Sequence, residues 1–89
     1  MIAKRFAANL SACRQRADLS QEDLGIRASL HRTEISQLER GLRVARIDTL
    51  VKLAGGLGVD PSELLKGIVW EPGATISGRF ELPDPAGSL

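Results

Sequence analysis

The chain has one cysteine, Cys13, and one histidine, His31, among its 89 residues. A single cysteine excludes an intramolecular disulfide and any zinc site built from several cysteines. A catalytic thiol would need a histidine as its base, and His31 is the sole candidate. Because Cys13 shares helical spacing with Phe6 and Leu10, we predict instead that it is a core residue.

Long apolar runs and internal repeats are also missing. No run approaches the ~18 apolar residues of a membrane-spanning helix, and residues 1–6 lack the apolar stretch of a signal peptide. We therefore expect a cytoplasmic protein that does not contact a membrane. The sequence shows no paired carboxylates, no nucleophile beside a base, no metal-ligand cluster and no phosphate-binding glycine loop. We expect no enzymatic activity, no cofactor and no metal.

The composition is that of a folded domain, with 43% hydrophobic and 26% charged residues. A domain this short buries only about 60% of its unfolded surface, so a partner subunit would help its stability. Residues 1–46 carry nine basic and five acidic side chains, whereas residues 47–89 carry three basic and six acidic ones. The basic first half suits a polyanionic partner such as nucleic acid.

Apolar spacing and helix-end signals predict three helices in the first half. The repeat of Phe6, Leu10 and Cys13 predicts a helix over residues 2–16. Ser20 is a typical N-cap with Asp23 three positions later, which predicts a second helix over residues 21–28. After a turn at Ser29-Leu30, a third helix is expected over residues 32–40, ended by Gly41.

The second half is expected to contain two more helices and a tail. A fourth helix begins near Ile47, with Leu50, Leu53, Ala54 and Leu57 facing inward. Gly55-Gly56 should shorten or fray it, since each glycine costs roughly 1 kcal/mol relative to alanine. Asp60-Pro61-Ser62-Glu63 begins a fifth helix that ends at Gly67. Two short strands around Pro72-Gly73-Ala74 and a disordered end should follow.

The third predicted helix has two chemically distinct faces. Ile35 and Leu38 project to one side, where a core can hold them. Small residues at Gly25 and Ala28 would let the preceding helix brace this one closely. The opposite side carries residue types that pair with base edges and phosphates. This arrangement predicts a helix-turn-helix that contacts DNA in the major groove. The outward residues are Arg32, Thr33, Ser36, Gln37 and Arg40.

On these motifs, the chain resembles the phage-repressor and Cro type, or XRE-like, helix-turn-helix family over residues 6–66. The resemblance implies an all-α, compact five-helix, lambda-repressor-like domain over residues 1–67. It also implies a homodimeric transcriptional regulator, bound to a palindromic operator with half-sites about one helical turn apart. The segment Leu30-His31-Arg32-Thr33 is similar to controller proteins of restriction-modification systems. The matching motifs are Ser20-Gln21-Glu22-x-Leu24, Ile35-Ser36-x-Leu38-Glu39-Arg40-Gly41, Ile47-x-Thr49-Leu50, Leu53-Ala54-x-x-Leu57-Gly58-Val59 and Leu64-Leu65.

The resemblance also assigns roles to individual residues. It makes Gln21 a phosphate contact at the start of the second helix. Arg40 and Arg43 fit contacts with the DNA backbone, and Glu39 pairs with Arg14 in a structural ion pair that joins two helices. For each DNA contact, the alternative is an exposed side chain that touches no DNA. The residues placed at or near base-contacting positions are Arg32, Thr33, Ser36 and Gln37.

Three positions depart from the family pattern. Ser29 stands where glycine is usual, so it would take a positive φ with some strain. His31 stands where a serine or threonine N-cap is usual, and a capping or phosphate-binding role is expected for it. Ala45 replaces a common proline, which leaves Arg46 at the N-cap of the fourth helix.

The tail, residues 68–89, leaves a second hypothesis open. Its aromatic residues, Trp70 and Phe80, could pack on the helices, on a second subunit in a dimer, or on another protein. In the last case, the chain would be an antitoxin-like or adaptor module that binds a protein partner through residues 68–82. Double-stranded DNA and a second copy of the chain remain the partners expected first.

Overall fold

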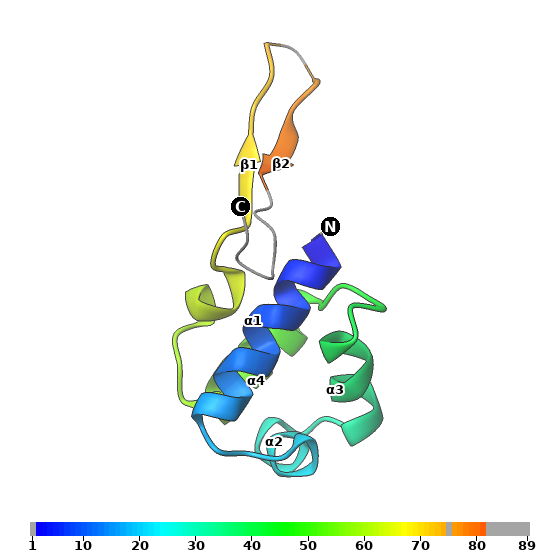
Figure 1. Ribbon diagram of the computed structural model, residues 1–89, viewed down its shortest axis with the longest axis vertical. Coiled ribbons are helices and arrows are strands. Elements are labelled where there is room, and N and C mark those ends of the chain that lie inside the picture. The colour runs from blue at the N-terminus through cyan, green and yellow to red at the C-terminus, as the bar shows by residue number, and fades with distance from the viewer. Residues whose placement is uncertain (1, 75, 82–89) are drawn as a thin grey trace.

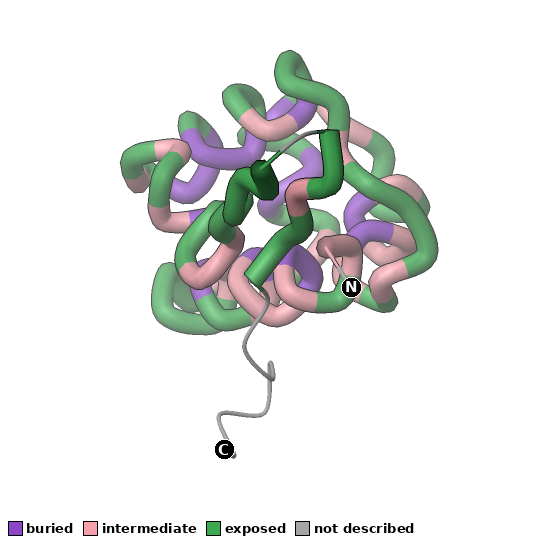
Figure 2. Tube along the Cα trace, turned by 90° about the horizontal axis from the view of Figure 1, so that it is seen from above, coloured by how far each residue is buried: buried purple, intermediate pink, exposed green. Residues whose placement is uncertain are grey.

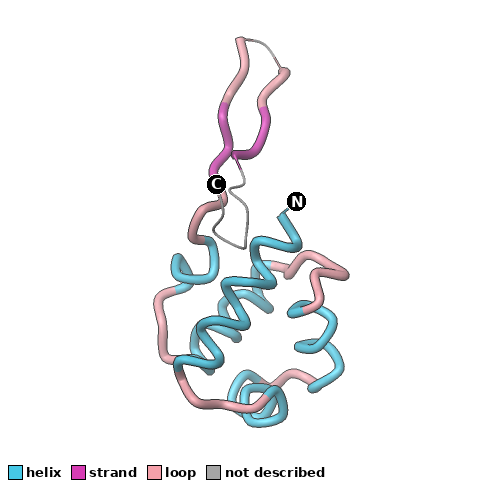
Figure 3. Tube along the Cα trace, in the orientation of Figure 1, coloured by secondary structure: helices cyan, strands magenta, loops and turns pink. Residues whose placement is uncertain are grey.

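The computed structural model describes residues 2–74 and 76–81. Within these residues, four α-helices and one 3-10 helix form a body, and a two-stranded hairpin projects from it (Figure 1). The all-α class with a hairpin tail is thus confirmed (Figure 3). The elements are α1 (Ile2–Arg16), α2 (Gln21–Ala28), α3 (Arg32–Glu39), α4 (Ile47–Leu57), the 3-10 helix η1 (Pro61–Leu65), β1 (Val69–Glu71) and β2 (Arg79–Glu81).

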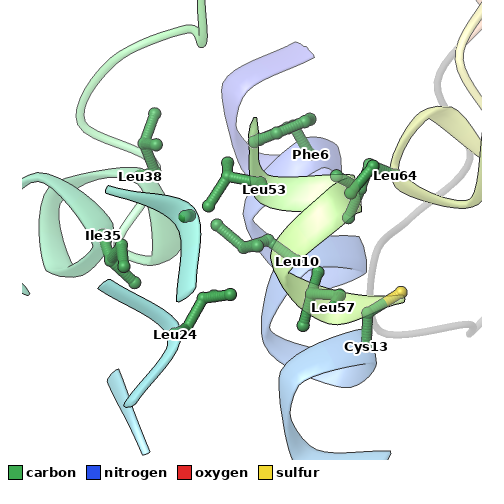
Figure 4. Packing of buried hydrophobic residues seen from close by; sticks show 11 residues of the cluster. Phe6, Leu10, Cys13, Leu24, Ile35, Leu38, Leu53, Leu57 and Leu64 are labelled. Atoms are coloured by element: carbon green, nitrogen blue, oxygen red, sulfur yellow. The ribbon is translucent and has the colours of Figure 1, made fainter. Parts of the chain in front are cut away.

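One hydrophobic core lies between the helices. Figure 4 shows Leu24, Ile35 and Leu38 together with Leu10 and Leu53, side chains that come from four different helices. The core role predicted for Cys13 is confirmed, because only 3% of this residue is exposed. The largest fully buried side chains are Leu10, Leu24, Ile35, Leu38, Leu53 and Leu64.

The expected fraying of α4 at Gly55-Gly56 is wrong, because the helix continues to Leu57. A Cβ on Gly56 would lie 3.1 Å from Leu24 Cδ1 and 3.3 Å from the Ala28 Cβ. Arg27 Nε also donates a 2.6 Å hydrogen bond to the Gly56 carbonyl. Close packing against α2 therefore outweighs the low helix propensity of glycine.

Two further helix ends differ from the sequence expectation. The third helix ends at Glu39, with Arg40 as a non-helical C-cap (φ −90°, ψ 1°). The fifth helix is the 3-10 helix η1, although Asp60 caps it as expected by accepting from Ser62 N at 2.9 Å. A segment of five residues is typical of the tighter 3-10 geometry. In α4, Leu50 is partly buried and packs against the core, so the inward orientation expected for it is confirmed.

Helix α1 holds the segment from which the hairpin leaves the body. Asn9 Nδ2 donates to the carbonyls of Leu64 and Lys66 at 3.0 and 2.9 Å, and Arg5 Nε donates to Lys66 O at 3.1 Å. Gly67 then turns the chain with φ 81°. A Cβ there would lie 2.9 Å from Arg5 Nε, so only glycine fits without displacing that side chain.

The hairpin pairs β1 with β2 in antiparallel register, with Val69, Trp70 and Glu71 opposite Glu81, Phe80 and Arg79. Two short strands are therefore confirmed, but residues 72–78 form a longer connection than the turn expected at Pro72-Gly73-Ala74. The disordered end, predicted to follow the second strand, lies outside the described residues. Figure 2 shows that both strands are exposed along their length.

Candidate nucleic-acid interface

The turn between α2 and α3 has the geometry that its sequence requires. Ser20 Oγ accepts from Asp23 N at 2.9 Å, and Asp23 Oδ2 accepts from Ser20 N at 3.2 Å, so the capping box is confirmed. Ser29 takes the left-handed conformation at φ 57° and ψ 45°, as its place in the turn predicted. A Cβ on Gly25 would lie 2.6 Å from the Leu30 carbonyl oxygen. Glycine at this position therefore lets the two helices close on each other.

Helix α3 presents the two faces that its spacing predicts. Ile35 and Leu38 are fully buried against the core, which fixes the helix on the body. Arg32 and Thr33 are exposed at its first turn. The outer face continues with the partly buried Ser36 and Gln37 and with the exposed Arg40.

A partly buried ion pair ties α3 to α1 and α2. Arg14 Nε and Nη2 donate to Glu39 Oε2 and Oε1 at 2.6 and 3.0 Å, which confirms the predicted brace. The Glu39 side chain is 7% exposed and that of Arg14 is 16% exposed. Gln21 Nε2 donates to Glu39 Oε1 at 3.1 Å, a bond that the sequence did not reveal. The second hydrogen of this amide remains for another acceptor, such as a phosphate oxygen.

A second polar group lies at the other end of the outer face. Arg43 Nη1 donates to Gln37 Oε1 at 3.2 Å, and Arg43 Nη2 lies 3.6 Å from Glu34 Oε2. Arginine carries only donors, so the Gln37 oxygen must face it, and the amide nitrogen is directed elsewhere. Sequence reasoning placed Arg43 on the DNA backbone and missed this contact, because the position of a loop side chain leaves no periodic signal.

Two helix starts lack the side-chain caps found elsewhere. His31 has extended backbone dihedrals but makes no capping hydrogen bond, so the capping role expected for it is wrong. Arg46 likewise makes no capping bond at the start of α4. The first backbone N–H groups of α3 therefore have no side-chain acceptor at this cap, which leaves them available to an anion.

The structure also reveals an exposed apolar surface that sequence reasoning missed. It follows the loop after α3 and the first two turns of α4. The sequence signal was present, since Ile47 and Val51 are four residues apart and share a helix face. Its members are Leu42 (63% exposed), Val44 (61%), Ile47 (80%) and Val51 (54%).

Two other kinds of site are absent from the described residues. No group of three His, Cys, Asp or Glu side chains in this part of the chain could hold a metal ion. No helix within it is both long and apolar enough to cross a membrane.

Comparison with known proteins identifies the family. The Helix-turn-helix family model matches residues 10–64. Control protein C.MunI of Mycoplasma sp is 38% identical over 68 residues, which cover 75% of this chain and 92% of that protein. Control protein C.BamHI of Bacillus amyloliquefaciens is 44% identical over 50 residues, or 56% of this chain, and the match spans 62% of its length.

A solved structure shows the same fold. The restriction-modification controller protein C.AhdI from Aeromonas hydrophila superimposes with a TM-score of 0.68 at 34% identity, over 70% of this chain and 94% of that one. The residues that the family model matches include α2 and α3. The chain therefore belongs to the XRE-type helix-turn-helix family of DNA-binding transcriptional regulators, which are not enzymes.

Proposed function

We propose that this protein binds a palindromic operator as a homodimer, with α3 of each copy in the major groove, and regulates restriction-modification genes. The observation that carries the proposal is the two-faced α3, whose inner residues are fully buried while Arg32 and Thr33 are exposed. The likeness to the restriction-modification controller protein C.AhdI supports the choice of regulated genes. A two-fold protein requires an operator with matching symmetry.

The proposal divides the interface residues by role. Arg32, Thr33, Ser36 and Gln37 contact bases and set the sequence. Gln21 uses its remaining amide hydrogen on a phosphate, while Arg40 and Arg43 lie near the backbone on either side of Gly41. Base contacts specify the operator and phosphate contacts orient the protein on it.

Selection of bound fragments from random double-stranded DNA, followed by sequencing, tests this proposal. We expect enriched inverted repeats with half-sites about one helical turn apart, and an affinity that falls steeply with salt. Fragments without symmetry, or binding that ignores both sequence and salt, would contradict it.

Variants separate the two kinds of contact. R32A and Q37A should each cost about 1–3 kcal/mol of binding and relax the preference at one position of each half-site. Q21A should weaken all sequences equally and leave the salt slope almost unchanged, because a neutral amide displaces no counterion from the phosphate. K52A is the matched control, because Lys52 is an exposed cation on α4 outside the proposed interface.

The contact between Arg43 and Gln37 adds a prediction about the base itself. Bidentate recognition of adenine needs the glutamine oxygen as an acceptor, and Arg43 already takes one of its two lone pairs and fixes its direction. Gln37 should then favour a base edge that offers acceptors, such as guanine N7 and O6. R43A frees the oxygen and should shift the selected base towards adenine. An unchanged base preference in R43A would show that the contact does not survive on DNA.

A further inference from the structure

The hairpin leaves its aromatic pair without cover from the helical body. The Trp70 and Phe80 rings are in edge-to-face contact, with centroids 5.0 Å apart and planes at 74°. Even so, Trp70 is 51% and Phe80 44% exposed. The two strands project away from the helices (Figures 1 and 2), and no third strand pairs with them among the described residues. A lone two-stranded hairpin is marginally stable in water, so this one would gain from a partner.

We propose that β2 pairs edge to edge with β2 of a second copy, antiparallel and centred on Phe80, to form a four-stranded intermolecular sheet. The inference rests on the proposed homodimer and names the surface that joins its two copies. Three or more strands with an apolar face give the stability that a single hairpin lacks.

The charge pattern of β2 selects a second copy as the occupant. A two-fold axis at Phe80 places Arg79 of each copy opposite Glu81 of the other, which gives two attractive cross-strand pairs. The same operation on β1 would place Val69 opposite Glu71, with no complementary charge. Only the β2 edge is therefore complementary to itself.

The proposed register also extends contacts that already exist within one hairpin. Arg79 Nη2 lies 2.6 Å from Glu71 Oε1 of its own chain, so each Arg79 would lie between two carboxylates. On the opposite face, Trp70 and Phe80 of each copy would form a row of four aromatic side chains across the sheet. A Cβ on Gly78 would overlap the Trp70 ring, so the absence of a side chain there leaves room for the indole on this face.

Trp70 is the only tryptophan, so its emission reports on the hairpin alone. Sedimentation equilibrium and Trp emission should be measured on the full chain over the same concentration series. We expect a monomer–dimer transition, and a blue shift with the same midpoint. Dimerisation without a change in emission would overturn the inference and point to the apolar surface at Leu42, Val44, Ile47 and Val51. A chain that stays monomeric would also overturn it.

Charge variants test the register directly. In E81R, the arginine introduced at position 81 of one copy would lie opposite Arg79 of the other, so two positive charges would repel each other. In E71R/R79E, the glutamate introduced at position 79 would lie opposite Glu81 of the other copy, so two negative charges would repel each other. The ion pair between positions 71 and 79 of one hairpin is reversed but kept, so each monomer should stay folded. Each variant alone should dimerise about tenfold or more weakly than the natural chain, because two attractive pairs become repulsive. An equimolar mixture of the two should recover dimerisation, since all pairs across the edge are then complementary.

The combined variant E71R/R79E/E81R is the matched control. It carries the same substitutions but restores opposite charges across the two-fold axis, so it should self-associate like the natural chain. Variants that all dimerise equally would contradict the register. So would a mixture that dimerises no better than its components.

A DNA-binding measurement keeps this inference separate from the proposed function. If E81R selects the same inverted repeat with unchanged affinity, the hairpin does not join the copies, although the proposed function stands. If the natural chain binds no inverted repeat, the proposed function fails whatever the hairpin does. We expect E81R to lose affinity for the full repeat and to keep its affinity for an isolated half-site.

Discussion

The helical body and the hairpin use the same kinds of side chain in opposite ways. Of the three aromatic residues in the chain, Phe6 is 4% exposed in the body, whereas Trp70 and Phe80 are 51% and 44% exposed in the hairpin. The body buries its core residues against helices of the same chain, although Leu42, Val44, Ile47 and Val51 stay exposed on its surface. The hairpin has only its own two strands for this purpose. The body thus has a hydrophobic core within one chain, whereas the two strands of the hairpin enclose none.

The polar groups show the same contrast. In the body, the nearly buried Glu39 is satisfied by both Arg14 and Gln21, and no buried side-chain donor or acceptor in the described residues lacks a partner. In the hairpin, the pair of Arg79 and Glu71 has side chains that are 74% and 46% exposed. Exposed pairs contribute little to stability by themselves. Changes to the body should therefore alter folding, and changes to the hairpin should alter association.

The largest effect is expected at the partly buried ion pair. E39Q keeps the shape of the side chain but leaves Arg14 uncompensated, and should lower the free energy of unfolding by about 3 kcal/mol. Urea denaturation followed by far-UV circular dichroism measures this. D48N is the matched control, because the pair of Arg46 and Asp48 is 79% and 61% exposed; it should change stability by less than about 0.5 kcal/mol. If E39Q and D48N lowered the free energy of unfolding equally, packed and exposed charges would not differ in their contribution to stability.

The second-largest effect on stability is expected at Gly56 of α4, and its neighbour Gly55 should respond in the opposite direction. G56A should cost about 1–3 kcal/mol, because its Cβ would meet Leu24 and Ala28 at 3.1 and 3.3 Å. G55A should instead stabilise by about 0.5–1 kcal/mol, since nothing lies within 4 Å of its Cβ and alanine favours the helix. Thermal melts of both variants give the comparison. A stabilised G56A would mean that α2 and α4 are not closely packed.

These glycines also show where sequence reasoning succeeds and fails. The bounds of α1 and α2 followed from local signals, namely the spacing of Phe6, Leu10 and Cys13 and the cap at Ser20. The behaviour of Gly56 depends on a helix that lies far away in the sequence, so propensity alone predicted fraying.

The candidate site divides in the same way. Helical spacing was enough to predict which side of α3 faces the core. The pairing of Arg43 with Gln37 depends on how a loop folds back, and no spacing rule reports that. The hairpin strands were predicted, but the turn signal at Pro72-Gly73 suggested a shorter connection than the one between Glu71 and Arg79.

A smaller effect is expected at the turn before α3. Ser29 adopts φ 57°, a conformation that costs a non-glycine residue about 1–2 kcal/mol. S29G should relieve this strain and, after the extra entropy of glycine in the unfolded chain, stabilise by about 0.5–1 kcal/mol. S29A is the control and should not stabilise. Trp70 emission should stay unchanged in both variants, because the turn and the hairpin lie at opposite ends of the molecule (Figure 1).

The smallest effect concerns acid stability of the body. The backbone N–H of Ser20 lowers the pKa of Asp23, and that of Ser62 lowers the pKa of Asp60. The carboxylates of Asp23 and Asp60 therefore bind protons more weakly in the folded state than in the unfolded chain. The resulting stabilisation is complete above the ordinary aspartate pKa and is lost as the pH falls through the lowered folded values. D23N/D60N should weaken the fall in stability between pH 5 and about 2, measured by urea denaturation at each pH. An equally steep fall in the double variant would place the acid sensitivity elsewhere, and the charged residues of the hairpin would then be the next to test.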